Sequence, residues 1–413
     1  MAFLQVLRIK DFRNLWLSQL ISQVFLNLLF FSLIIRIYEL THSNSAVSVL
    51  VFLQTLPNIA LGALAGVLVD RWGRKPVMFF SHFLRVLAVL AVLLSSETIG
   101  WLYALAFLIS VITQFFFPAE AGTIYDVVED KNLLLTANSL FSVTFFASVI
   151  LGNVLAGPFL LLFGAHLTFF IVAMAFLLAS IFTARLPGSG VLKFRHEAGG
   201  FDLNHIFSDF LVGLDHLYHS PQVRRGIFLL GASQITIGIL GVIAPGFADR
   251  ILHIPVPTVS LFVMAPAAAG MALGALVLGQ FFRHAKRESL IRVGFYMAAI
   301  FLVIYSLVDK IAGGINLPIV AISVVVLLLL GAANAFLDIP VNTMIQENTP
   351  QEVRSRVYGV VSTVIGLAGV FPIVLSGALA DVIGVRMVML ITGAVLLILA
   401  IKYNRANYAS HPS

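Results

Sequence analysis

Hydrophobic residues in this chain gather into long runs, and short polar segments separate each run from the next. Each run holds about 20 residues, which is enough for a helix to cross roughly 30 Å of hydrocarbon. Helices are the expected form because a backbone inside lipid must satisfy its own hydrogen bonds. The pattern predicts about twelve spans, with approximate bounds 14–38, 45–69, 76–96, 100–127, 136–163, 166–186, 223–247, 258–282, 289–308, 317–344, 355–381 and 385–403.

A short internal repeat suggests that the spans form two groups. The sequence VLAG at 154–157 recurs as VLSG at 374–377, in the corresponding part of the second group. The longest polar segment, 187–222, separates six spans from six. We therefore expect an all-α integral membrane protein of two six-helix halves, 1–186 and 223–413, joined by a cytoplasmic linker.

Composition supports a membrane protein and excludes several functions. Of the 413 residues, 60% are hydrophobic and only 11% are charged, whereas soluble domains have about 25% charged residues. The chain has no Cys, which excludes disulfides, thiolate metal sites and cysteine nucleophiles. We expect no metal and no other cofactor. The net charge of +6 is explained by the loops, so we expect no nucleic-acid partner.

The positions of Lys and Arg indicate an orientation. If the N-terminus is cytoplasmic, the external segments contain only Arg36, Arg250, Lys310 and Arg386, and Arg85 lies within a span. The other Lys and Arg residues then lie in cytoplasmic segments, as the positive-inside rule requires. We expect a multi-pass protein of the bacterial inner (plasma) membrane, with both termini in the cytoplasm.

One charged segment interrupts two apolar runs near the start of the chain. Asp70, Arg71, Arg74 and Lys75 follow one run directly and precede the next. A charge at the centre of a bilayer costs several kcal/mol, so this segment is predicted to be a tight turn at the membrane face. Gly73 allows the chain to reverse direction there.

This segment closely resembles motif A of the major facilitator superfamily, whose pattern is G-x-L-x-D-R-x-G-R-K. The resemblance implies that superfamily's fold, with a substrate site between the two halves near the midplane. It also implies a gating role, in which Asp70 engages the cytoplasmic end of span 11 and Arg74 binds a carboxylate at the end of span 4. The implied gating residues are Gly66, Asp70, Arg71, Gly73, Arg74 and Asp126.

Spans 1, 4 and 5 are similar to one branch of that superfamily. The matching sequences are FFPAEA at 116–121, ANSL at 137–140, and LW at 15–16 followed by QLIS at 19–22. They resemble the twelve-span drug:proton antiporter-like exporters, which include macrolide and enterobactin exporters. The resemblance implies a monomer that exports hydrophobic or amphipathic molecules by alternating access, coupled to protons. The glycine-rich pattern of such antiporters is incomplete after Gly157, so uncoupled transport stays an alternative.

Two carboxylates within the spans are candidates for proton coupling. Glu120 lies roughly 10 Å from the cytoplasmic end of span 4, at about 1.5 Å per residue. Loss of water disfavours the ionised form of a carboxyl group, so Glu120 could exchange a proton. Alternatively, Glu120 is the static partner of Arg85, which lies at a similar depth in span 3. Asp338 in span 10 is the second candidate.

Polar side chains recur every four residues on several spans, and therefore lie along one face of each helix. Such stripes are expected to face the interior of the bundle or a water-filled cavity. They could bind a substrate through uncharged hydrogen bonds, or they could hold helices together. The candidates are Gln19, Gln23, Asn27, Gln54, Asn58, Gln234, Asn334 and Asn342, with Asp338 between the last two.

Small-molecule export is not the only function that the sequence could serve. The protein could instead transport a lipid or lysolipid, since a sparsely charged cavity would suit such amphipathic molecules. An enzyme is not expected, because the sequence contains no phosphate-binding loop of the G-x-x-x-x-G-K type and no H-E-x-x-H. A non-transporting membrane sensor is a further alternative, although such a protein would be expected to carry a sizeable soluble domain.

A second stretch, GALADVIGVR at 377–386, also resembles the charged segment at 66–75. By the predicted topology it lies between spans 11 and 12, on the outer face of the membrane. The sequence therefore predicts a tight external turn there.

Overall fold

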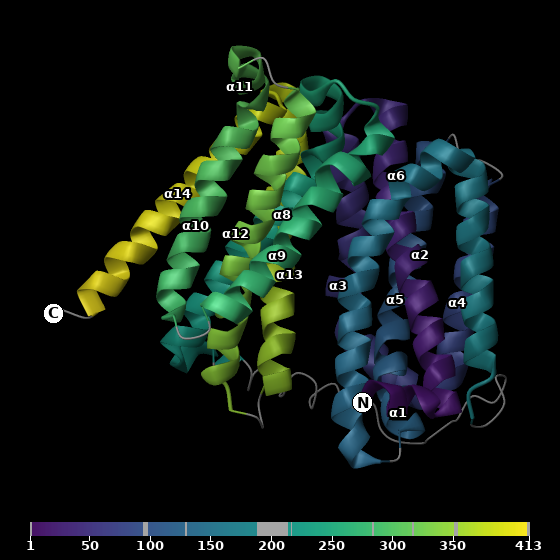
Figure 1. The fold of residues 1–413 in the computed structure, drawn as a ribbon. Helices are drawn as coiled ribbons and strands as arrows, with labels where there is room; N and C mark the ends of the chain where they lie inside the picture. The colour runs from purple at the N-terminus through teal and green to yellow at the C-terminus, as the bar shows by residue number, and fades with distance from the viewer. Residues whose placement is uncertain are drawn as a thin grey trace. The chain divides into compact units, whose positions relative to one another are not determined.

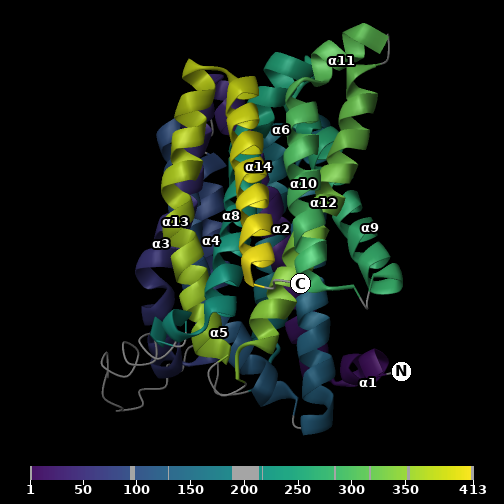
Figure 2. The ribbon, with the colours of Figure 1, turned by 90° about the vertical axis from the view of Figure 1, so that its left-hand side faces the viewer.

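A computed structural model describes residues 2–93, 98–128, 130–187, 214–215, 217–282, 285–315, 318–350 and 354–410. The described chain is built of helices and contains no strand (Figures 1 and 2). Eleven of its stretches are long and apolar enough to cross a membrane. One of these contains two of the expected spans, so the prediction of twelve membrane-spanning helices is confirmed.

The helices follow the predicted spans closely. The first six spans correspond to α2 (Lys10–Thr41), α3 (Asn44–Trp72), α4 (Arg74–Leu93), α5 (Ile99–Val127) and the two parts of α6 (Lys131–Ala184), and the short α1 (Ala2–Arg8) precedes them. The last six correspond to α8 (Pro221–Phe247), η3 (Ser260–Met264) with α9 (Ala265–Phe281), α10 (Arg287–Ser306), α12 (Ile319–Glu347), α13 (Arg354–Val382) and α14 (Val385–Ser410). The short η1 (Ala248–Leu252), η2 (Val256–Thr258) and α11 (Val308–Ile315) lie in the connections.

The long helix α6 is broken at one glycine. Gly164 has φ 67° and ψ 174°, a backbone conformation that only glycine adopts readily. The break divides α6 into two helices at the boundary expected between spans 5 and 6. The chain therefore reverses direction at this glycine, between two helices that follow each other without a polar loop.

By its internal contacts the chain forms two compact units. The first unit comprises residues 1–40 and 50–201, and the second comprises 41–49 and 202–413. Segment 41–49, around the turn from α2 to α3, thus belongs to the second unit. Most of the expected linker at 187–222 lies outside the described residues, and the division at that linker stays a prediction.

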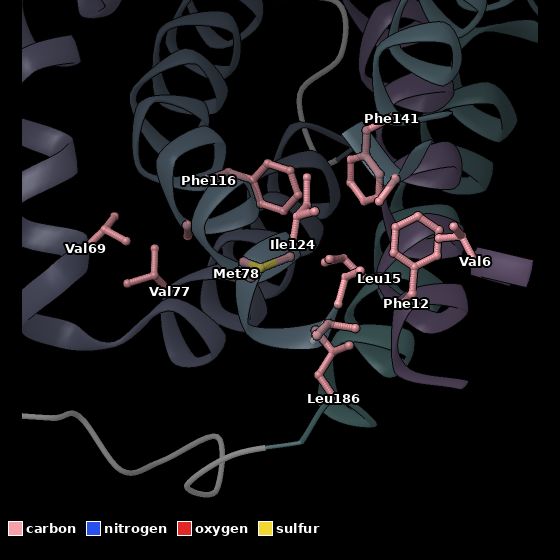
Figure 3. Packing of buried hydrophobic residues seen from close by; sticks show 14 residues of the cluster. Val6, Phe12, Leu15, Val69, Val77, Met78, Phe116, Ile124, Phe141 and Leu186 are labelled. Carbon is pink, nitrogen blue, oxygen red and sulfur yellow. The ribbon is translucent and has the colours of Figure 1, made fainter. Parts of the chain in front are cut away.

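One hydrophobic cluster in the first unit has members on all six helices from α1 to α6. Met78 of α4 lies in it with Leu15 of α2, Ile124 of α5 and Phe141 of α6 (Figure 3). The ring of Phe12 meets that of Phe141 edge to face, with 5.5 Å between centroids. The apolar faces of α2, α4, α5 and α6 are therefore packed together at one end of this unit.

Two glycines bring α9 and α12 together in the second unit. A β-carbon on Gly270 would overlap the carbonyl oxygen of Leu328, and one on Gly331 would overlap that of Ala267. Small residues that let helix backbones approach are a common means of association within membranes. α12 also packs against α10 and α8, so the contact with α9 holds a central helix of this unit.

We predict that Gly331→Ala lowers the melting temperature of the purified protein in detergent by several degrees. The added methyl group must push α9 away from α12, and overpacking of this kind costs about 1–3 kcal/mol. Gly279→Ala on α9 is the matched control, because nothing lies within 4 Å of a β-carbon there. Equal melting temperatures for the two variants would contradict the close approach of these helices.

Candidate functional site

A buried arginine lies at the centre of a polar cluster in the first unit. Arg85 of α4 is completely buried, and its Nη2 donates a hydrogen bond of 2.9 Å to Thr113 Oγ1 of α5. Its guanidinium carbon lies 4.8 Å from the ring centroid of Phe116 and 5.6 Å from that of Phe176. Aromatic faces attract cations. Side chains of α5 and α6 thus take the place of water around this charge.

Glu120 is the acidic member of the same cluster. It is 5% exposed, and its charge interacts with that of Arg85 without a direct ion pair between them. Glu120 Oε1 has no hydrogen-bond partner, nor do Nε and Nη1 of Arg85. Unpartnered buried polar atoms are costly. Glu120 and Arg85 therefore do not form a closed, static ion pair. The unpartnered atoms of the cluster are suited to bind a water molecule, a proton or a polar ligand.

A histidine extends this cluster toward α2. His82 is completely buried, and its Nε2 lies 3.1 Å from Ser18 Oγ. Ser18 lies 2.9 Å from Thr183 Oγ1 and donates to the carbonyl oxygen of Ala179 at 3.0 Å. The His82 ring also packs on Phe116, with 4.8 Å between centroids. Hydroxyl groups of α2 and α6 are thus connected to His82 of α4.

The polar stripe predicted on α2 is mostly buried. Gln19 and Gln23 are 3% and 1% exposed. Gln19 Nε2 donates to the carbonyl oxygen of Phe141 at 3.4 Å, and Asn27 Nδ2 donates to that of Gln23 at 2.8 Å. The Oε1 atom of Gln19 and the Nε2 atom of Gln23 have no partner. This stripe therefore joins helices only weakly and keeps free hydrogen-bonding atoms inside the unit.

The two candidates on α3 differ from each other. Gln54 is partly buried and its Nε2 has no partner, whereas Asn58, four residues later, is exposed. Only Gln54 is thus placed like the α2 amides.

A second cluster surrounds Asp338 in the second unit. Ser233 Oγ of α8 donates to Asp338 Oδ1 at 2.7 Å, and Gln234 Nε2 donates to Oδ2 at 3.2 Å. Asn334 Nδ2 donates to Ser233 Oγ at 3.0 Å, and Asn342 Nδ2 to the Asp338 carbonyl oxygen at 2.9 Å. Asp338 is 8% exposed and makes no ion pair with any described residue. Within the part of the chain that the structure describes, both donors to this carboxylate are neutral.

The charged segment at 66–75 places an arginine across α5. Arg74 Nη1 donates to both carboxylate oxygens of Asp126, at 2.8 and 2.9 Å, and to the carbonyl oxygen of Gly122 at 2.9 Å. The end of the Arg74 side chain lies directly against Gly122, where a β-carbon would overlap it. Gly73 reverses the chain with φ 89°.

Arg71, which lies in the same charged segment, is partly buried. The environment of Gly66 and the side chain of Asp70 lie outside what the structure describes. The expected contact of Asp70 with span 11 therefore stays a prediction.

Sequence reasoning did not identify Ser18, Thr113 or Ser233 as cluster members. Ser and Thr are common in membrane helices, where their hydroxyls often bond to the preceding turn, as Thr113 does to the carbonyl oxygen of Ile109. A usable signal existed at Thr113, which lies two helical turns from Glu120 and therefore on the same face of α5.

We predict that Arg85→Ala lowers stability by about 3–5 kcal/mol, because it removes a buried charge from its partners and leaves Glu120 without a counter-charge. Adding Glu120→Gln should recover part of that loss. The measurement is a double-mutant cycle of unfolding in detergent. Additive effects of the two substitutions would contradict an energetic link between the side chains.

The chain is similar to known transporters along most of its length. The chain is 26% identical over 369 residues to the uncharacterized MFS-type transporter YfiS of Bacillus subtilis (88% of this chain and 85% of that protein). It is 25% identical to Macrolide efflux protein A of Streptococcus pyogenes (94% of each chain) and to the multidrug efflux pump Tap of Mycolicibacterium fortuitum (88% of each). The solved structure of the nucleoside transporter NupG shares the fold, with a TM-score of 0.70 and 15% identity over 96% of this chain and 98% of that one. The model of the Major Facilitator Superfamily matches residues 15–372 and 316–409, and the protein belongs to this family of transporters.

Proposed function

We propose that this transporter exports hydrophobic or amphipathic small molecules in exchange for protons, by alternating access. The observation that carries the proposal is the buried carboxylate of Glu120, which has a free oxygen beside an arginine that it does not contact directly. The similarity to two efflux proteins supports the direction of transport. The proposed coupling groups are Glu120, Arg85 and Asp338.

Protonation of Glu120 would change the charge of its cluster. With Glu120 ionised, its charge balances that of Arg85, and the pair is neutral as a whole. With Glu120 protonated, the positive charge of Arg85 stays uncompensated in a desolvated place, which costs free energy. If this free-energy cost differs between two conformations of the transporter, binding of a proton shifts the population from one conformation to the other.

The proposed substrate contacts are mainly amides. Gln19 and Gln23 keep free polar atoms inside the first unit, and neither side chain carries a charge. Amide groups can both donate and accept hydrogen bonds, which suits a range of amphipathic molecules. The other proposed contacts are Asn27, Gln54, Asn58, Gln234, Asn334 and Asn342.

The distribution of Lys and Arg supports the proposed orientation, with both termini in the cytoplasm of a bacterial cell and the turn at Gly73 on the cytoplasmic face. We propose that the protein works as a monomer.

The first test uses inside-out vesicles that are energised to be acid inside. We predict that a macrolide or a lipophilic dye accumulates in them while protons leave, and that Glu120→Gln abolishes both signals. Glu288→Gln is the control, because it makes the same change at an exposed position at the start of α10. Accumulation that persists in Glu120→Gln would exclude Glu120 as the coupling group. Accumulation without proton release would indicate uncoupled transport, and no response to any compound would favour a lipid substrate.

We also predict that Asp126→Asn lowers the transport rate about threefold and leaves substrate affinity unchanged, since the lost ion pair is exposed and such pairs contribute about 0.2–1 kcal/mol. The reason is that the contact with Arg74 is proposed to stabilise one conformation rather than to touch the substrate. Exchanging the two residues, as Arg74→Asp with Asp126→Arg, should restore part of the rate. A variant that loses affinity at an unchanged rate would contradict the gating role.

A further inference from the structure

The carboxylate of Asp381, near the end of α13, is enclosed by the turn between α2 and α3. Its Oδ1 accepts hydrogen bonds of 3.0 Å from both N and Nδ2 of Asn44. Its Oδ2 accepts from Ser43 Oγ at 2.7 Å, and from N and Oγ of Ser45 at 2.8 and 2.7 Å. Arg250 Nη2 lies 3.5 Å from Oδ1. Three consecutive residues of the turn thus donate to a single carboxylate.

This arrangement caps a helix with a side chain from a distant part of the sequence. α3 begins at Asn44, and the first amides of a helix have no partner within it. A negative charge at this end is favourable, because the helix dipole is positive there. The contact is also close, since a β-carbon on Gly377 would overlap the backbone of Asn44 and the side chain of Ser48.

The capped segment has an unusual position in the chain. Residues 41–49 belong to the second unit by their contacts, whereas the residues directly before and after them belong to the first. Asp381 is therefore one of the groups that hold this short segment to the second unit, together with Arg250, whose Nη2 donates to the His42 carbonyl oxygen at 2.7 Å.

The stretch that contains Asp381 repeats the geometry of the charged segment at 66–75. Glycine, leucine, aspartate and glycine occur at the same spacing in both, at 66, 68, 70 and 73 and at 377, 379, 381 and 384. Gly73 and Gly384 have the same φ of 89°. Shortly after each of these glycines, an arginine pairs with a carboxylate of another helix, Arg74 with Asp126 and Arg386 with Asp309.

We propose that Asp381 is a gating residue of the transport cycle and works as a latch. It holds segment 41–49 on the second unit in one conformation and releases it in the other. By the proposed topology this latch lies on the outer face, opposite the segment at 66–75. The proposal rests on the protein being a transporter and does not depend on its substrate or on proton coupling.

The first test is hydrogen exchange measured by mass spectrometry on the peptide that contains residues 41–49. In Asp381→Asn, amide exchange in this peptide should become about tenfold faster or more, because charged hydrogen bonds to two of its amides are weakened. Asp309→Asn is the matched control, since it removes a carboxylate from the Arg386 pair and leaves the cap of α3 intact. Unchanged exchange in Asp381→Asn would overturn the proposal.

The second test distinguishes a latch from a static cap. The chain has no Cys, so Ser48→Cys introduces a single thiol at a position that is 2% exposed. Its reaction with a membrane-impermeant maleimide should become faster with Asp381→Asn and slower with Arg74→Ala, which weakens the opposite segment. A static cap predicts no effect of Arg74→Ala, and that result would overturn the latch.

The control is Ser306→Cys, at a completely buried position at the end of α10. Its labelling rate should be the same in both backgrounds, and parallel changes there would indicate that the substitutions loosen the whole protein, which would overturn the latch.

Discussion

Inside a bilayer no water is available to polar groups, so each buried polar side chain must find a partner among the helices or carry a free-energy cost. This constraint explains how the charged groups of the protein are held. Arg85 lies between two aromatic rings and a hydroxyl, and Asp338 accepts hydrogen bonds from a serine and a glutamine, both neutral, among the described residues. Where atoms stay unpartnered, as at Glu120, the cost is itself a reason to expect a function.

Much of the fold could be predicted from the sequence, because the same constraint acts on local sequence. The length of an apolar run decides whether a helix can cross the hydrocarbon, and the helices α2, α4 and α10 begin or end within a few residues of the expected bounds. The pair formed by Arg74 and Asp126 was also within reach, because a recognised motif fixed the position of one member.

The organisation of the clusters could not be predicted in the same way. Ser233 connects Asn334 to Asp338, and Ser18 connects His82 to Thr183. A hydroxyl in an apolar run gives no sign of which helix it will face. The carboxylate of Asp381 is more than three hundred residues from the helix that it caps, so the reason for its position appears only when the chain is folded.

The repeated turn has a consequence for how such a protein can evolve. If the segments around Gly73 and Gly384 stabilise opposite conformations, the equilibrium between those conformations depends on the difference between the two and not on the strength of either. Selection for fast transport would then keep the stabilising free energies of the two segments similar. A substitution that strengthens one turn would slow the cycle although it makes the folded protein more stable, and a second substitution in the other turn, far away in sequence, could restore it.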